Sequence, residues 1–146
     1  MKVINKDILS VTEGMIVHQV NCMGVMGAGL ALDIKRKWRK VFYQYKQYVE
    51  NCSGAELGDV QFVQITDSIY VCNLFSQKYY GKDKGMLYTN YEAMEKGFKT
   101  INERSKELKL PIYIPFKIGC GLGNGDWTKV YSLISKYIPN STICRK

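Results

Sequence analysis

The sequence has 146 residues, of which 46% are hydrophobic and 23% are charged. This length predicts one globular domain over residues 1–146 and excludes two full domains, and the composition excludes a disordered chain. The longest mostly apolar stretch, residues 20–32, contains an asparagine and three glycines, and the N-terminus has no signal-peptide pattern. We therefore expect a cytoplasmic protein with no membrane partner.

Basic residues outnumber acidic ones, with 21 Lys and Arg against 13 Asp and Glu, and the formal net charge is +8. This balance favours anionic or phosphorylated partners without naming one. The densest basic run, residues 35–40, also contains Trp38 and is flanked by Leu32 and Phe42. We interpret it as the solvated face of a helix whose apolar residues point inward, because no nucleic-acid-binding motif accompanies it.

The cysteines and the single histidine bear on disulfides and metals. Five cysteines, at positions 22, 52, 72, 120 and 144, are widely spaced with no Cys-x-x-Cys pair, and His18 is the one histidine. This pattern predicts neither a disulfide framework nor a structural zinc site. We expect no metal and no cofactor.

Strand and helix signals alternate along the chain. In order, they predict strands at 3–4 and 15–21, a helix at 30–48, a strand pair at 60–65 and 69–74, a helix at 91–108, a strand at 111–116, a helix at 127–137 capped by Asp126, and a strand around Ile143. This order predicts an α/β fold of three layers, in which a mixed β-sheet carries helices on both faces.

Two glycine clusters carry the first functional signal. Three glycines lie in residues 24–29 and four in residues 119–125, which together hold seven of the 13 glycines of the chain. Each cluster follows a predicted strand and precedes a predicted helix, where exposed backbone N–H groups favour phosphate. Two such loops suit a diphosphate, while the alternative is that they are tight turns. Neither cluster is G-x-G-x-x-G or a P-loop, which disfavours dinucleotide redox enzymes and P-loop NTPases.

Four segments that span nearly the whole chain carry a resemblance to a known family. They are residues 5–9 (NKDIL), 18–31 (HQVNCMGVMGAGLA), 73–77 (NLFSQ) and 114–122 (IPFKIGCGL). In sequence and order they resemble the macro domains, which bind ADP-ribose and its derivatives. Within that family the chain is similar to the short subgroup of ADP-ribose-1″-phosphate phosphatases and terminal ADP-ribose protein glycohydrolases.

The resemblance implies a binding site. Asp7 would accept a hydrogen bond from the adenine amino group, the following backbone at Ile8 would seat the ring, and Asn21 would hold the distal ribose hydroxyls. By position alone, Asp7 could instead be a solvated turn residue and Asn21 a turn former. The loops expected to wrap the diphosphate and distal ribose are Gly27, Ala28 and Gly29 on one side and Ile118, Gly119, Cys120, Gly121, Leu122, Gly123 and Asn124 on the other. We interpret the Cys120 thiol as a packing group and not as a nucleophile.

Two residues are candidates for catalysis. His18 stands where the subgroup has histidine and could transfer a proton as a group leaves C1″, or it could be an inert histidine packed near a strand. Asp126 could orient water or simply cap the helix that follows. Glycohydrolases that use a covalent lysyl intermediate carry lysine where this chain has Gln77 and aspartate where it has Gly123. Lys78 is one residue out of phase and would point away.

Three functions follow from these residues and stay open at this point. The first is an ADP-ribose-1″-phosphate phosphatase, the second a mono-ADP-ribosyl glycohydrolase or O-acetyl-ADP-ribose deacetylase, and the third a non-catalytic ADP-ribose reader. The expected partners are ADP-ribose or its 1″-derivatives, with ADP-ribosylated protein or nucleic acid as larger substrates. We expect the protein to be a monomer.

Overall fold

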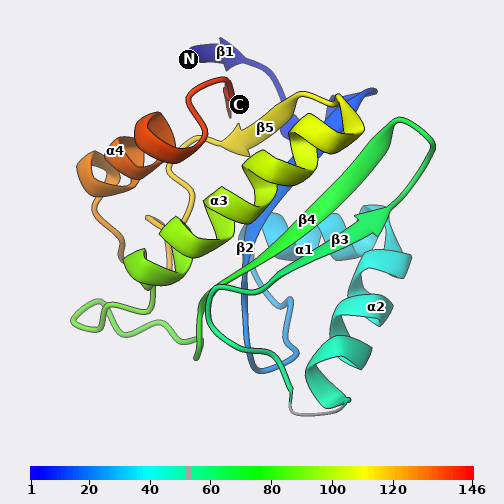
Figure 1. Cartoon of the computed structure of the whole chain (residues 1–146). Helices are drawn as coiled ribbons and strands as arrows, with labels where there is room; N and C mark the ends of the chain where they lie inside the picture. The colour runs from blue at the N-terminus through cyan, green and yellow to red at the C-terminus, as the bar shows by residue number, and fades with distance from the viewer. Residues whose placement is uncertain (52–53) are drawn as a thin grey trace.

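The structure, a computed structural model, describes residues 1–51 and 54–146, and within them a six-stranded mixed sheet lies between two layers of helices (Figure 1). The strands are β1 (Lys2–Asn5), β2 (Gly14–Asn21), β3 (Val60–Gln64), β4 (Ile69–Gln77), β5 (Ile112–Pro115) and β6 (Thr142–Arg145). The helices are α1 (Gly29–Lys37), α2 (Arg39–Glu50), α3 (Tyr91–Leu108) and α4 (Trp127–Tyr137), with a 3-10 turn, η1, at Ile8–Ser10. Cys52 and its expected lack of a disulfide partner lie outside the described residues.

The sheet places five strand ends at one edge. The strand order is β1-β6-β5-β2-β4-β3, and every neighbouring pair is parallel except β3 with β4. The chain leaves β2 in one direction to form β4 and then crosses back over β2 to form β5. Because the chain continues on opposite sides of β2, a crevice opens at the carboxyl ends of the strands there. Open α/β sheets bind ligands at this position. The predicted α/β class, with a mixed sheet and helices on both faces, is confirmed.

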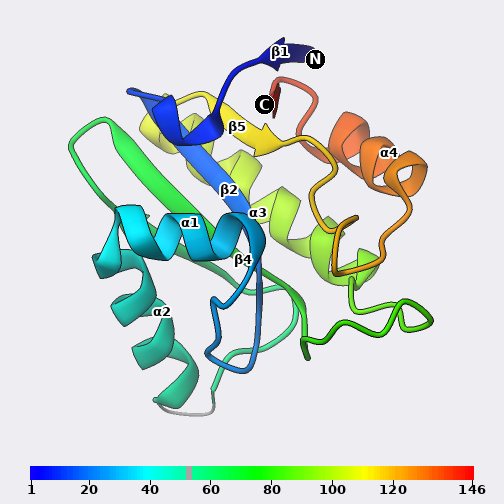
Figure 2. The same ribbon diagram turned by 180° about the vertical axis from the view of Figure 1, so that it is seen from behind.

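Successive residues of β2 point to opposite faces of the sheet, and each face has its own core. Met15 and Val17 pack in the cluster under α3 and α4, whereas Val20 packs with Ile34 and Tyr45 under α1 and α2. Figure 2 shows α1 and α2 on one side of the sheet and α3 and α4 on the other. Both faces of β2 are therefore buried, so its polar residues must find partners inside the protein.

The predicted helix at 30–48 is wrong as a single element. The structure breaks it at Trp38, which lies between α1 and α2 and has a non-helical backbone (φ −131°, ψ 86°). The Trp38 side chain packs against two core clusters, and this contact holds a break that neither glycine nor proline marks in the sequence. The break also shifts the buried face, because Val41 is fully buried while Leu32 and Phe42 are only half-buried.

The predicted strand at 69–74 ends too early. β4 continues to Gln77, and Phe75 and Gln77 pair with Val20 and Asn21, with Ser76 as the extra residue of an irregularity on β4. Among the added residues, Ser76 is buried and donates a hydrogen bond to Gln19 Oε1 at 2.6 Å. Because β4 is longer, the loop that follows it begins at the ligand edge of the sheet, by which we mean the side where the carboxyl ends of the parallel strands lie.

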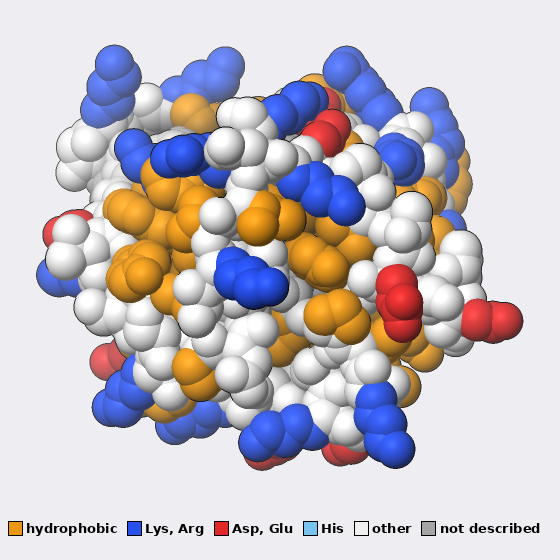
Figure 3. Space-filling model, turned by 90° about the horizontal axis from the view of Figure 1, so that it is seen from above, with side chains coloured by type: hydrophobic (Ala, Val, Ile, Leu, Met, Phe, Trp, Pro, Cys, Tyr) orange, Lys and Arg blue, Asp and Glu red, His pale blue; other side chains and the backbone are white. Residues whose placement is uncertain are grey.

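The basic run at 35–40 is a solvated surface, as predicted. Lys37 Nζ donates to the Leu9 carbonyl at 2.7 Å, Lys40 Nζ donates to the Gln64 carbonyl at 2.6 Å, and Arg36 and Arg39 are exposed. On the face shown in Figure 3, Lys and Arg side chains are scattered over the rim and the middle and do not form one patch. None of the helices in the described ranges is long and apolar enough to cross a membrane.

Candidate functional site

A cavity of about 480 Å³ lies at the carboxyl ends of β2, β4 and β5. This volume is within the usual range for a small-molecule site, roughly 300–1,000 Å³. His18 and Gln19 of β2 form part of its wall. The other lining residues come from three loops: 25 and 27–31 after β2, 77 and 80–82 at the end of β4, and 115–119 with 121–123 after β5. Both glycine clusters of the sequence therefore line one cavity.

The first glycine loop presents the beginning of α1 to the cavity. Gly29 has a left-handed backbone (φ 56°), and an added Cβ there would meet nothing within 4 Å. Ala28 precedes the helix without a side-chain cap, and the first turn of α1 has no acidic residue. The first N–H groups of a helix lack partners within the helix and favour an anion. This end of the cavity is suited to a phosphate.

The second glycine loop is tightly built. Gly123 and Gly125 cannot carry a side chain, because an added Cβ would lie 2.7 Å and 2.6 Å from the Gly119 carbonyl oxygen. Tyr88 N and Thr89 N both donate to the Gly123 carbonyl oxygen, at 3.0 Å and 3.1 Å. By contrast, Gly121 faces open space. Gly123 and Gly125 are thus required by packing and Gly119 by its left-handed backbone (φ 74°), while Gly121 leaves room in the cavity.

His18 is the titratable group in the cavity wall that is deepest in the fold. Its side chain is 1% exposed, and Nε2 lies 2.6 Å from Asn73 Oδ1 on the neighbouring strand. Asn73 Nδ2 donates to Gln61 Oε1 at 3.0 Å, and Gln61 Nε2 donates to the Gln44 carbonyl at 2.9 Å. His18, Asn73 and Gln61 are register partners, so this hydrogen-bond chain crosses three strands.

The direction of this chain fixes the tautomer of His18. The Gln44 carbonyl can only accept, so Gln61 donates to it, Asn73 donates to Gln61, and Asn73 Oδ1 is left to accept. His18 Nε2 therefore carries the hydrogen, and Nδ1 is a bare acceptor. Nδ1 is buried and has no hydrogen-bond partner. Burial lowers the pKa of His18 to about 4 against the opposing effect of the Asn73 hydrogen bond, so the ring is neutral at pH 7.

Asn21, expected to hold ribose hydroxyls, is engaged in its own loop. Its Oδ1 accepts from Met23 N at 3.0 Å and from the Tyr45 hydroxyl at 2.7 Å, and its Nδ2 donates to the Val25 carbonyl at 2.8 Å. Asn21 is not among the cavity-lining residues. Its amide shapes the first glycine loop, as the turn-former alternative describes, and its contact with ribose stays a prediction.

Asp7 and Ile8 also lie outside the cavity wall. Asp7 Oδ1 accepts from Leu9 N at 3.0 Å, which lowers the pKa of the carboxyl group, and Oδ2 lies 3.3 Å from Lys146 Nζ. Ile8 is buried in a core cluster with Ile16. Asp7 follows β1 at the ligand edge of the sheet, but the predicted adenine contact is not tested by this arrangement.

The structure brings neither Asp126 nor Cys120 into the cavity wall. Asp126 Oδ1 accepts from Thr128 N at 2.9 Å and so caps α4, as the sequence predicts. Cys120 Sγ contacts the Ile118 carbonyl at 3.4 Å, and burial raises the pKa of the thiol. These positions fit a cap and a packing group, and a catalytic role for Asp126 stays a prediction.

The remaining residue of the second loop, Asn124, ties that loop to the one before α3. It has a left-handed backbone (φ 61°), and its Nδ2 donates to the carbonyls of Asp83 and Met86 at 2.9 Å and 2.7 Å. Asn124 is not a lining residue. Of the predicted ligand-binding residues, those that do line the cavity are Gly27, Ala28, Gly29, Ile118, Gly119, Gly121, Leu122 and Gly123.

The end of β4 separates Gln77 from Lys78. Gln77 lines the cavity and accepts from Gln19 Nε2 at 2.7 Å, whereas Lys78 lines a different, smaller cavity. The prediction that Lys78 points away from the main site is confirmed. The part of the chain that the structure describes contributes no Asp or Glu to the main cavity wall. Nor does it hold a cluster of three or more His, Cys, Asp or Glu residues suited to a metal.

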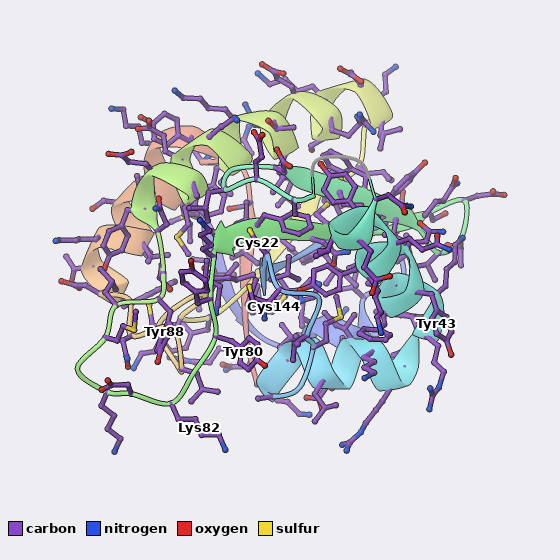
Figure 4. The ribbon with its side chains drawn as sticks, turned by 90° about the horizontal axis from the view of Figure 1, so that it is seen from below. Cys22, Tyr43, Tyr80, Lys82, Tyr88 and Cys144 are labelled. Carbon is purple, nitrogen blue, oxygen red and sulfur yellow. The ribbon has the colours of Figure 1, made fainter. Side chains whose placement is uncertain are left out.

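Several cavity residues were missed by the sequence analysis. Phe116 and Lys117 follow β5, and Tyr80 and Lys82 lie on the loop between β4 and α3 (Figure 4). Phe116 is the last residue of the strand predicted at 111–116, and this position could have indicated that it lies at the carboxyl end of the sheet, where ligands bind. Tyr80 and Lys82 could not be placed, because β4 was expected to end at position 74.

The sheet order and the two glycine loops at the carboxyl ends of β2 and β5 define the chain as a macro domain in fold. Its structure superposes on a macrodomain protein from Streptomyces coelicolor with a TM-score of 0.79, at 26% sequence identity over 99% of this chain and 97% of that one. A protein from Bacteroides thetaiotaomicron gives a TM-score of 0.90 at 27% identity and covers 100% of this chain and 99% of its own. The macro-domain resemblance seen in the sequence is confirmed.

Two curated proteins are similar to the chain in sequence. An uncharacterized 17.5 kDa protein of enterobacteria phage T4 is 28% identical over 144 residues, or 94% of this chain and 89% of that protein. A DNA ADP-ribosyl glycohydrolase of Thermus aquaticus is 27% identical over 144 residues, or 93% of this chain and 37% of that enzyme. The chain thus spans about a third of the length of the glycohydrolase. No family profile matches the chain.

Proposed function

We propose that this chain binds ADP-ribose in the main cavity and hydrolyses the bond between C1″ of the distal ribose and an attached group. ADP-ribosylated nucleic acid is the first candidate substrate. In this reaction the bond from C1″ to the base breaks, the oxygen of a water molecule bonds to C1″, and a proton from that water passes to the leaving base. The products are free ADP-ribose and the unmodified strand.

One observation carries the proposal: both glycine loops line a single cavity of about 480 Å³ with an uncapped helix N-terminus in its wall. Backbone N–H groups at the beginning of α1 suit one phosphate, and the second loop closes over the opposite side. Lys82 and Lys117 add positive charge to the wall. A diphosphate with sugar on both sides matches this size and charge.

Phe116 is our candidate for the aromatic that stacks on adenine. Phe116 is a lining residue of the cavity, and Arg145 Cζ lies 5.5 Å from the centroid of its ring. Arg145 precedes Lys146, the ion-pair partner of Asp7, so Phe116 and Asp7 belong to the same corner of the sheet edge. An adenine ring there would stack on Phe116 and offer its amino group toward Asp7.

His18 supplies the acceptor near the reacting carbon in this proposal. The hydrogen-bond chain through Asn73 and Gln61 holds Nδ1 bare, and no carboxylate from the described residues lines the cavity. Nδ1 is buried in this structure, so a movement of the cavity wall on ligand binding would have to open it before it accepts a hydrogen bond from the attacking water or from a ribose hydroxyl. Replacement of His18 by Ala is expected to lower turnover by about 10²–10⁴-fold while ADP-ribose affinity stays within a few-fold.

The sequence relatives favour nucleic acid as the carrier of the ADP-ribose. The Thermus aquaticus relative and a Mycobacterium tuberculosis relative, 26% identical over 129 residues, are both DNA ADP-ribosyl glycohydrolases. The chain covers 37% and 34% of those two proteins. The net charge of +8 also suits a polyanionic substrate.

The second candidate is ADP-ribose-1″-phosphate phosphatase. Gln77 occupies the position where lysine-dependent glycohydrolases carry their lysine, and Lys78 lines another cavity. A water-based reaction at a phosphate on C1″ needs no such lysine. In this reaction too, His18 Nδ1 would accept from the attacking water, because a nitrogen without hydrogen cannot donate to the phosphate oxygens.

The test offers the purified protein four substrates side by side: ADP-ribosylated DNA, ADP-ribosylated protein, ADP-ribose-1″-phosphate and O-acetyl-ADP-ribose. We expect free ADP-ribose to form fastest from the DNA substrate, and no loss of rate with a chelator. Faster release of inorganic phosphate from the 1″-phosphate would favour the second candidate. Binding of ADP-ribose without turnover of any substrate would leave a reader.

A binding control separates the site from the fold. Gly121→Val places two methyl groups in the open space of the cavity, so calorimetry should show loss of ADP-ribose binding with an unchanged Tm. Absence of heat and of competition for the unmodified protein at millimolar ADP-ribose would overturn the proposal.

A further inference from the structure

A second, smaller cavity adjoins the main one. It has a volume of about 160 Å³, and its wall includes Lys78, Tyr79, Met86 and Leu87. Residues 78–79 line this cavity and residues 80–82 line the main cavity, so one short segment contributes to the walls of both. A group joined to a ligand in the main cavity and emerging over this segment would meet the second cavity.

The surface around this segment is aromatic and basic. Tyr79 and Tyr80 are 51% and 55% exposed, and Met86 and Leu87 are 46% and 53% exposed. None of these four side chains belongs to a core cluster in the described part of the chain. The fold therefore gains little from them, which is unusual for two tyrosines and a leucine in adjoining turns of one loop.

Lysines surround these exposed rings. Lys78, Lys82 and Lys84 lie in the same loop, and Lys78 Nζ is 5.5 Å from the centre of the Tyr79 ring. The acid between the last two lysines, Asp83, accepts a hydrogen bond from Gly85 N at 2.9 Å. The loop thus presents a net positive charge beside its aromatic faces.

The loop is held in place by the second glycine loop. Asn124 Nδ2 donates to the Asp83 and Met86 carbonyls, and Tyr88 N donates to the Gly123 carbonyl. The Tyr88 hydroxyl accepts from Asp83 N at 3.3 Å. Figure 4 shows Tyr80, Lys82 and Tyr88 on this loop, with Tyr80 near the beginning of α1. The exposed side chains are therefore preorganised next to the main site.

We propose that this surface binds the single-stranded nucleic acid that carries the ADP-ribose, with one base in the second cavity against Tyr79 and phosphates on Lys78 and Lys84. This inference rests on the proposed function. Proteins that bind single strands combine lysines along the backbone with aromatic rings on which bases stack. A cavity of 160 Å³ lies below the usual size of a small-molecule site and suits one planar ring. An acidic peptide would use the lysines but not the exposed rings.

The test compares two substrates that carry the same ADP-ribose on the same base, a mononucleoside and a short single strand. Tyr79→Ala should raise KM for the strand by about 10-fold, as expected for loss of one base stack, and leave the mononucleoside unchanged. Lys78→Ala should lower the salt dependence of strand binding, with a slope smaller by about 0.7 for one lost phosphate contact.

Tyr43 offers a matched control. It is 56% exposed on α2, and Figure 4 shows it on the opposite side of the molecule from Tyr80 and Lys82. Tyr43→Ala should change neither substrate. Equal losses for Tyr79→Ala on both substrates, or no loss on the strand, would overturn the proposal, as would a loss confined to an ADP-ribosylated peptide.

A separate measurement distinguishes this inference from the proposed function. Unmodified single-stranded DNA should bind the full chain in fluorescence anisotropy, and Tyr79→Ala should weaken that binding. If ADP-ribose does not bind but the DNA result holds, the proposed hydrolase fails and the strand surface stands. If ADP-ribose binds and unmodified DNA shows no dependence on Tyr79, the strand surface fails alone.

Discussion

Two neighbouring residues of β2, His18 and Gln19, begin hydrogen-bond networks on opposite faces of the sheet. On the α1 and α2 face, His18 leads through Asn73 to Gln61 and leaves one imidazole nitrogen without a partner. On the α3 face, Gln19 accepts from Ser76 and donates to Thr89, which donates to the Gly119 carbonyl. The His18 network thus contains a nitrogen acceptor with no hydrogen-bond partner. The Gln19 network ends on the Gly119 carbonyl and so holds the second glycine loop in place.

One strand therefore both positions a loop of the site and supplies a titratable group to it. The Gln19 network consists of amides and hydroxyls, which have no proton to gain or lose near neutral pH, and its end point is the backbone of the second glycine loop. The His18 network contains the one imidazole of the chain. Removing a member of the His18 network should therefore alter the chemistry and its pH dependence. Removing a member of the Gln19 network should alter the stability of the second glycine loop.

The largest expected effect is on the pH dependence of stability through His18. Its pKa is about 4 in the folded protein against about 6.5 unfolded, so the unfolded state binds the proton first as pH falls. Above pH 6.5 the neutral His18 does not lower the free energy of unfolding. Between pH 6.5 and 4, proton binding to the unfolded state lowers that free energy by about 3 kcal/mol. Urea unfolding at several pH values measures it.

His18→Phe provides the comparison for that measurement. Carboxyl groups titrate in both proteins, so the difference between their two curves isolates the imidazole. We expect the variant to lose less stability than the parent between pH 6.5 and 4. Parallel curves would contradict a buried, neutral His18. A nitrogen-15 spectrum of the parent should also show hydrogen on Nε2 and none on Nδ1.

The next effect contrasts two glycines of the second loop. An added Cβ at Gly123 would lie 2.7 Å from the Gly119 carbonyl oxygen and would also overlap Thr89 Oγ1, whereas one at Gly121 would meet nothing. Gly123→Ala should lower the free energy of unfolding by about 2–3 kcal/mol, and Gly121→Ala by less than about 0.5 kcal/mol. Chemical denaturation of both variants checks this. Equal losses would mean that Thr89 and Gly119 move aside easily.

These glycines also show how far the sequence could predict the site. Spacing along the chain placed both clusters after strands and before helices, and the structure confirms that both line one cavity. The sequence could not tell which glycine is demanded by packing, since that depends on Thr89, which is 30 residues away from Gly119. Contacts between loops that are distant in sequence leave no local pattern.

Features that depend on local sequence could be predicted, whereas features that depend on tertiary contacts could not. Helices α3 and α4 begin at the predicted residues because the side chains of Asn90 and Asp126 cap their first turns through local hydrogen bonds. The break at Trp38 and the extension of β4 depend on tertiary packing and on cross-strand pairing, which override local propensity. Tyr80 and Lys82 were missed as a consequence of that strand extension.

A smaller effect is expected at the centre of the closed network. Thr89 is 2% exposed, and its Oγ1 donates to the Gly119 carbonyl at 2.6 Å and accepts from Gln19 Nε2 at 3.0 Å. Thr89→Val keeps the shape but leaves both partners without this bond, at a cost of about 1–2 kcal/mol in the free energy of unfolding.

The control for Thr89 is Thr100→Val on α3. Thr100 Oγ1 donates only to the Lys96 carbonyl, at 3.3 Å, near the helix surface. Its loss should change stability by less than about 0.5 kcal/mol. A Thr89→Val protein as stable as the Thr100→Val protein would show that the second glycine loop does not depend on the Gln19 network.

The smallest effect on stability is expected at Asp7, which belongs to neither network. Its Oδ2 faces Lys146 Nζ at 3.3 Å, but the Lys146 side chain is 82% exposed, and solvent-exposed ion pairs contribute little. Asp7→Asn keeps an oxygen for Leu9 N and should change the free energy of unfolding by less than about 0.5 kcal/mol. Because the fold is unaffected, a loss of ADP-ribose affinity in calorimetry can be assigned to a lost contact with the ligand.

The resemblance to macro domains predicts that Asp7→Ala, which removes the carboxylate, weakens the binding free energy of ADP-ribose by about 1–3 kcal/mol. Wild-type affinity in both variants would place adenine elsewhere and leave Asp7 as the cap of η1 alone.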